Sequence, residues 1–133
     1  MLNSDVLFFF EKMPGALPLY ETFAARVLAE TDCGSVRVQK TQISFANSHN
    51  FAFVSLLPVR RAKDRPAAYI TVTFGVDHRV DSPRIDAVSE PYPHRWTHHL
   101  LISAPEEIDD ELMCWIKEAA AFSARKRAGG RGR

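Results

Sequence analysis

Runs of β-forming residues predict five strands along the chain, at residues 36–39, 43–45, 51–57, 68–74 and 96–102. Residues 68–74 alternate most cleanly, with Ile70, Val72 and Phe74 on one face, which is typical of a half-buried antiparallel strand. Residues 46–50, Ala-Asn-Ser-His-Asn, favour turn geometry. The segment 43–57 is therefore predicted to form a central β-hairpin.

Apolar positions at three- and four-residue steps predict three helices. The first runs from Ser4 or Asp5 to about Lys12 and is broken by Pro14 and Gly15. The second covers residues 17–28, with Pro18 near its start. The third begins at the capping-box pattern of residues 103–106 and continues to about Arg127. We expect the aromatic cluster at residues 7–10 to be buried against the second helix; an exposed patch for a partner is the alternative.

Leading helices, then strands, then a covering helix predict an α+β fold, with helices packed on one face of an antiparallel sheet of four to five strands. Residues 79–93 contain three prolines and little periodicity, so we interpret them as a long irregular connection. A chain of 133 residues has the size of one domain. We expect that domain to span residues 1–124.

The charge of the chain is concentrated at its end. Five of the 17 basic side chains lie in residues 125–133, and the remainder carries 12 basic and 16 acidic side chains, a net charge of −4. This Gly-rich basic segment is predicted to be a disordered tail. Short basic tails contact nucleic acid in some proteins and only increase solubility in others.

Several classes of protein have no support in the sequence. No segment approaches the roughly 18 apolar residues of a membrane span, and the apolar run at residues 6–10 lacks the features of a signal peptide. The two cysteines, Cys33 and Cys114, are far apart, so we expect free thiols in a reducing, cytoplasmic compartment. There is no phosphate-binding glycine motif and no pattern of a catalytic nucleophile. We therefore predict a domain that is not an enzyme and needs no cofactor.

A change of phase between two strands marks the first candidate site. Val36 and Val38 share one face, and continuing the alternation would turn Ile43 outward. A bulge, bend or tight turn must therefore lie between Gln39 and Ile43. A bulge would aim Lys40, Thr41 and Gln42 into a functional site, whereas a simple hairpin corner would leave them in solvent.

Two segments of this chain, and the order in which they occur, resemble those of a known family. The segments are Gln39-Lys40-Thr41-Gln42-Ile43-Ser44-Phe45 and Trp96-Thr97-His98-His99-Leu100, followed by Trp115-Ile116. They resemble the family catalogued as domain of unknown function 5655 over roughly residues 7–122. Members are small, mostly bacterial domains, and the resemblance implies no established activity. It marks Lys40 and His98 as positions in characteristic segments, and we expect these two residues to lie close together.

Histidines do not form a standard metal site in the sequence. His98 and His99 must point to opposite faces of a strand, and His94 lies too far from His98 along it. We predict no metal site. A site assembled from His78, His98 and Asp77 is the alternative.

What remains is a set of positive, amide and aromatic side chains that suits an anionic ligand. The candidate ligand-binding residues are Lys40, Thr41, Gln42, Trp96, His98, Arg79 and Arg95. In the alternative interpretation Lys40 lies at the rim, and His98 and Trp96 belong to the core.

Two functions follow from these features. The first is a non-enzymatic binding module for an anionic small molecule or a partner segment. The second is an accessory nucleic-acid binder that uses the basic tail and the turn at residues 60–65.

Overall fold

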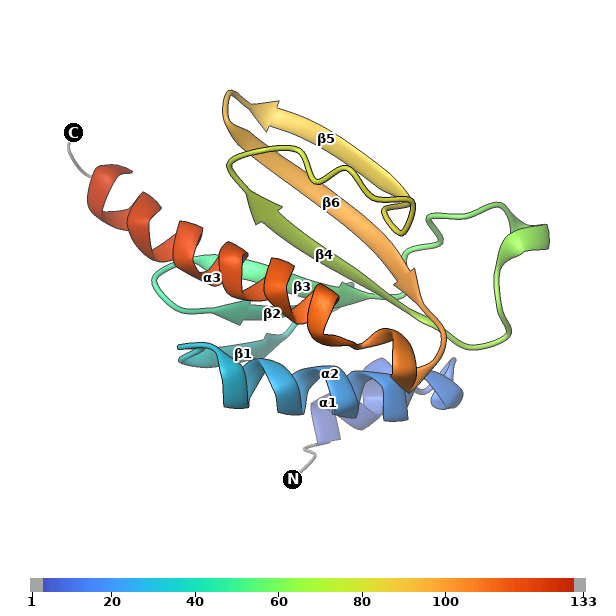
Figure 1. The fold of residues 1–133 in the computed structure, drawn as a ribbon. Helices are drawn as coiled ribbons and strands as arrows, with labels where there is room; N and C mark the ends of the chain where they lie inside the picture. The colour runs from blue at the N-terminus through green and yellow to red at the C-terminus, as the bar shows by residue number, and fades with distance from the viewer. Residues whose placement is uncertain (1–3, 131–133) are drawn as a thin grey trace.

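The computed structural model describes the backbone of residues 4–130 and the side chains of residues 4–125. Its helices are α1 (Ser4–Phe9), α2 (Leu17–Glu30) and α3 (Asp110–Gly130) (Figure 1). Its strands are β1 (Ser35–Val38), β2 (Ile43–Ala46), β3 (Asn50–Ser55), β4 (Ile70–Val76), β5 (Ala87–Tyr92) and β6 (Arg95–Ile102). Short 3-10 helices cover Pro14–Ala16, Ala62–Asp64 and Pro105–Glu107. The fold is therefore α+β.

The six strands form one antiparallel sheet in the order β1-β2-β3-β4-β6-β5. The prediction of four to five strands is wrong because β5 lies in the segment predicted to be irregular. β5 is an edge strand whose residues are mostly exposed, and it contains Pro91. An edge strand exposed on both faces needs no apolar alternation, so its pairing with β6 leaves no periodic signal in the sequence.

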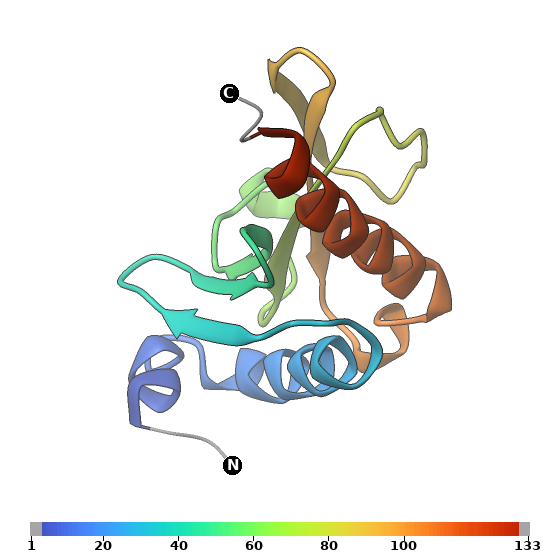
Figure 2. The same ribbon diagram turned by 90° about the vertical axis from the view of Figure 1, so that its left-hand side faces the viewer.

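One cross-strand row of the sheet organises the core. Val36, Phe45, Ala52, Phe74, His98 and Val88 pair in succession across all six strands. Phe23 of α2 meets Phe45 edge-on at 5.6 Å between ring centroids. Trp115 of α3 stacks on Phe74 at 5.8 Å. Because paired residues share a face, α2 and α3 pack against the same face of the sheet (Figures 1 and 2).

The segment between β3 and β4 closes part of the opposite face. The hydroxyl of Thr71 donates to the carbonyl of Leu57 at 2.6 Å, and the hydroxyl of Tyr69 donates to that of Leu56 at 3.1 Å. Thr71 is fully buried, so its polar atom needs this partner. These bonds bring the connection back against the sheet.

The predicted change of phase after β1 is a tight turn. Val38 pairs with Ile43, and the amide of Gln39 donates to the carbonyl of Gln42 at 2.9 Å. The chain reverses over residues 39–42, which returns Ile43 to the face of Val38. The side chains of Lys40 and Thr41 are exposed at the tip of this turn. Of the two alternatives for residues 40–42, a bulge and a simple hairpin corner, the structure contains the hairpin corner.

The helices differ from their predicted limits at several ends. α1 stops at Phe9, and within the predicted buried cluster Phe10 is buried while Leu7 and Phe8 are 52% and 75% exposed. α3 begins at Asp110, because the carboxylate of Asp109 accepts the amide of Leu112 at 3.0 Å and caps the helix there.

The C-terminal end of α3 overlaps the segment predicted to be a tail. Its backbone reaches Gly130, so residues 125–130 of the segment predicted to be a disordered basic tail lie within the helix. Residues 131–133, and the side chains from 126 onward, lie outside the described residues. No helix among residues 4–130 is both long and apolar enough to cross a membrane.

Candidate functional site

The structure places the predicted ligand-binding residues in separate regions. Lys40 lies in the β1–β2 turn, at the edge of the sheet, whereas Trp96 and His98 lie on β6, which is four strands from β1 and three from β2. Three to four strand spacings amount to about 14–19 Å. The prediction that Lys40 and His98 lie close together is therefore wrong. The order of the strands determines their separation, and the sequence pattern did not reveal that order.

Lys40 and Thr41 instead line a groove of about 890 Å³ against α1. The groove also contains Phe8 and Leu57, which are 75% and 51% exposed. Its charged lining residues are two acids and two lysines. This balance gives the groove no preference for an anion. Gln42 lies beside it, with its amide 3.4 Å from the side-chain oxygen of Gln39.

His98 is a structural residue of the core. It is fully buried, its ring stacks on Phe74 at 4.8 Å, and its Nε2 accepts the amide of Val80 at 2.9 Å. Its proton therefore resides on Nδ1, which has no hydrogen-bond partner among the described residues. Burial lowers the pKa of His98, so the ring stays neutral. This side chain holds the start of the β4–β5 connection against the sheet.

The candidate Arg79 belongs to the β4–β5 connection, as does Arg84, and it does not join the other candidates. Arg79 lines a hollow of about 220 Å³ that also contains Asp81 and Asp86. The guanidinium group of Arg84 donates to the carbonyl of Glu107 at 2.6 Å and to the carboxylate of Asp109 at 2.9 Å.

The contacts of Arg84 attach the connection to the start of α3. Burial acts to raise the pKa of Asp109, but hydrogen bonds from the Leu112 amide and from Arg84 outweigh it and lower the pKa of this carboxyl. Asp109 is thus held ionised where it caps the helix and binds Arg84.

Arg95 lies at a cavity with a volume of about 220 Å³. It opens where β3 and β4 separate: their last pair is Ala52 and Phe74, although β3 begins at Asn50 and β4 continues to Val76. The C-terminal half of α3 and the β5–β6 turn complete its walls. The lining residues are Asn50, Phe51, Phe53, Thr73, Phe74, Gly75, Val76, Pro91, Tyr92, Arg95, Trp96, Thr97, Ala119, Phe122 and Ser123.

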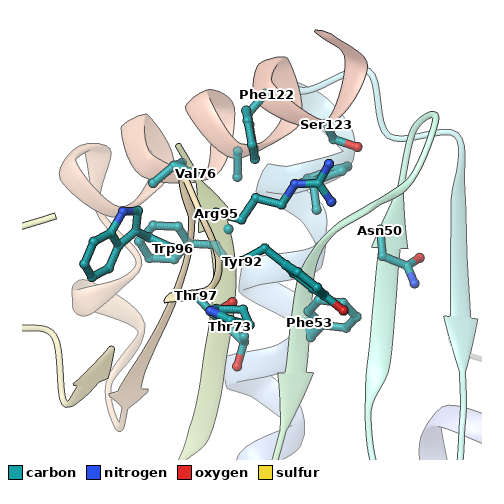
Figure 3. A pocket seen from close by; sticks show the side chains of 15 residues that line it. Asn50, Phe53, Thr73, Val76, Tyr92, Arg95, Trp96, Thr97, Phe122 and Ser123 are labelled. Carbon is teal, nitrogen blue, oxygen red and sulfur yellow. The ribbon is translucent and has the colours of Figure 1, made fainter. Parts of the chain in front are cut away.

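Arg95 is the one charged side chain in this lining. Its guanidinium group points toward α3, with the ring of Tyr92 alongside it at 5.9 Å (Figure 3). Trp96 lines the same cavity, but its indole points away from Arg95 (Figure 3). No carboxylate pairs with Arg95 among residues 4–125. The cavity therefore presents a positive charge without a counter-ion.

The neutral polar groups around Arg95 differ in their availability. The hydroxyl of Thr73 lies 2.8 Å from Nδ1 of His99, and that of Ser123 donates to the carbonyl of His49 at 3.1 Å. Burial lowers the pKa of His99, which keeps this second ring neutral as well. The exposed amide of Asn50 has no hydrogen-bond partner among the described residues. Asn50 and Arg95, together with the hydroxyls of Tyr92 and Thr97, are thus the polar groups available to a ligand.

Asn50 and Tyr92 were not among the residues predicted for the site. Tyr92 ends β5, a strand without a periodic signal, and Asn50 was assigned only to a turn. The aromatic residue next to the Pro93-His94 turn, with an arginine directly after it, is the signal that could have indicated this site.

A second cluster of chemical interest lies at the end of β4. One ligand atom from each of Asp77, His78 and Glu118 lies within 4.8 Å of the others. Nε2 of His78 contacts the carboxylate of Glu118, and this hydrogen bond raises the pKa of His78. Asp77 pairs with Arg125 at 3.6 Å. The metal alternative with His98 as a ligand is wrong, because Nε2 of this buried ring accepts the Val80 amide and the third ligand atom of the cluster comes from Glu118.

The basic turn predicted for nucleic acid is partly engaged within the protein. Arg60 pairs with Asp86 at 2.9 Å, and Arg61 lies 3.9 Å from Asp64. Apart from Arg125, the basic side chains of the tail lie outside the described residues.

These features define a small α+β domain with one six-stranded antiparallel sheet and a positively charged cavity. The model of one family, described as a domain of unknown function (DUF5655), matches residues 9–123. The chain belongs to this family, as the resemblance of its two segments predicted. No curated protein and no solved structure matches the chain.

Proposed function

We propose that this domain is a non-enzymatic binding module whose cavity between β3 and β4 takes a small anionic group. The observation that carries the proposal is the unpaired guanidinium group of Arg95, which lies at a cavity whose other lining residues are neutral. A carboxylate or phosphate is the partner that such a guanidinium group binds most strongly.

The remaining lining residues support a ligand with an apolar or aromatic body. The rings of Phe51, Phe53, Tyr92 and Phe122 contribute to the walls, and aromatic pairs add stability beyond the area that they bury. A volume of about 220 Å³ is below that of sites for drug-sized molecules, about 300–1,000 Å³. The cavity therefore suits a single-ring carboxylate, or one anionic side chain of a partner segment.

Benzoate tests the proposal because it combines one ring with one carboxylate. Titration followed by ¹⁵N-edited NMR should shift the amides of residues 50–53, 73–76, 92–97 and 119–123. The cationic analogue benzylamine should leave them unchanged. A charge-assisted hydrogen bond contributes about 1.5–3 kcal/mol. Arg95→Gln should therefore weaken benzoate binding by about 10- to 100-fold.

Arg79→Gln and Lys40→Gln are the matched controls, because each removes one positive charge outside this cavity. Both variants should bind benzoate like the unaltered chain. Undiminished binding by Arg95→Gln, or amide shifts centred on the Lys40 groove, would contradict the proposal. Nucleic-acid affinity that falls steeply with salt and disappears on deletion of residues 125–133 would support the accessory nucleic-acid binder instead.

A further inference from the structure

Asp77, His78 and Glu118 bring one imidazole and two carboxylate groups together, although His78 and Glu118 are separated by 40 positions in the sequence. Asp77 and His78 directly follow β4, and Glu118 lies in the middle of α3. We propose that these three side chains bind a divalent transition-metal ion of the Zn²⁺ type.

The orientation of His78 suits a metal ligand. Its Nδ1 lies 3.3 Å from the carbonyl oxygen of Arg79, so Nδ1–H donates to that oxygen. Nε2 faces the carboxylate of Glu118, and without a metal ion a proton on Nε2 makes the hydrogen bond between them. Metal-binding histidines typically have their second ring nitrogen held by a carbonyl or carboxylate in this way. A metal ion can replace this proton, and Nε2 then offers its lone pair to the metal while Nδ1–H stays bonded to the carbonyl oxygen.

The spacing of the three groups allows coordination with small movements. Nitrogen and carboxylate ligands lie about 2.0–2.2 Å from Zn²⁺, which places tetrahedral ligand atoms about 3.4 Å apart. The present ligand atoms all lie within 4.8 Å of one another. The side chains of Asp77, His78 and Glu118 are 46%, 52% and 38% exposed, so packing restrains their rotation only in part. Asp77 must leave Arg125, but exposed ion pairs contribute little stability.

The donor set selects the class of metal. One imidazole nitrogen suits zinc and its first-row neighbours, whereas Mg²⁺ and Ca²⁺ prefer oxygen ligands alone. Two carboxylates balance the charge of a divalent ion. The bound ion would link the beginning of the β4–β5 connection to α3, at the point where His78 already contacts Glu118.

Calorimetric titration of ZnCl₂ into the full chain, stripped of metal with a chelator, tests the site at a fixed pH of about 7.5. We expect saturable binding of one ion, a higher melting temperature with Zn²⁺ than with Mg²⁺, and a shift of the His78 ring resonances. His78→Ala, Asp77→Asn and Glu118→Gln should each weaken Zn²⁺ binding at least tenfold. Far-UV circular dichroism checks that each variant is folded.

His94→Asn is the matched control, because His94 is an exposed histidine in the β5–β6 turn, outside the cluster. It should bind Zn²⁺ like the unaltered chain, and so should Arg95→Gln, which separates this site from the anion cavity. Absence of one-to-one binding would overturn the proposal. So would binding that survives Asp77→Asn and Glu118→Gln, since a lone histidine would then account for it.

Discussion

Replacing His98 with leucine separates a structural role of this residue from a binding role. His98→Leu fills the buried position with an apolar side chain but removes Nε2, which accepts the Val80 amide at 2.9 Å. A buried donor left without a partner costs about 1–3 kcal/mol. Loss of the stacking on Phe74, at 4.8 Å and 9°, adds about 0.5–1.5 kcal/mol. Removal of the buried Nδ1–H, which has no partner among the described residues, offsets part of this loss, so we expect the free energy of unfolding to fall by about 1–3 kcal/mol.

The pH dependence of unfolding provides a second measure of the same residue. Burial lowers the pKa of His98, so between this pKa and the unfolded value of about 6.5 the unfolded chain binds a proton that the folded chain does not. Stability should therefore fall as the pH drops below about 6.5, by up to about 1.4 kcal/mol per pH unit for this one group. His98→Leu should lose that contribution. The part due to His99, whose pKa burial also lowers, should remain.

Urea denaturation followed by circular dichroism between pH 5 and 8 measures both effects. His94→Asn is the control, and at this exposed turn the expected change is about 0.5 kcal/mol or less. A stability of His98→Leu within that margin, or an unchanged slope below pH 6.5, would refute the structural role. Weaker benzoate binding in a fully stable His98→Leu protein would return this residue to the ligand site.

Three further substitutions, with Gly34→Ala as a control, test the fold by urea denaturation. Gly15→Ala should destabilise it by about 1–3 kcal/mol, because the added Cβ would lie 2.9 Å from that of Ala68; Gly34→Ala, whose nearest atom is 4.0 Å away, should cost clearly less. Arg84→Gln should cost about 1–3 kcal/mol through its lost charge-assisted bonds to Glu107 and Asp109, directly before α3, and an unchanged stability would show that they contribute nothing. His94→Gly should stabilise the protein by about 0.5–1 kcal/mol, because residue 94 has a φ of 62°; a loss of stability would contradict this reasoning.

The local pattern of the sequence predicted most elements but not the limits of the sheet. Strands with one buried face, such as Ile70–Val76, show a period of two because alternate side chains enter the core. β5 has no such face and was missed. The capping carboxylate at the start of α3 is Asp109, which lies beyond the predicted capping box, because a short 3-10 helix at Pro105–Glu107 precedes the α-helix.

The location of the candidate site depends on the order of the strands in the sheet, and the local sequence pattern did not reveal that order. The resemblance to the family and the need for a turn after Gln39 followed from residue types and a two-residue period, which are local properties. The pairing of β4 with β6 instead placed three strands between β1 and β6, which separated Lys40 from Arg95. That pairing, together with the divergence of β3 from β4, created the cavity. Period and residue type place each side chain on a face of its own strand, but only tertiary packing chooses which strands are neighbours.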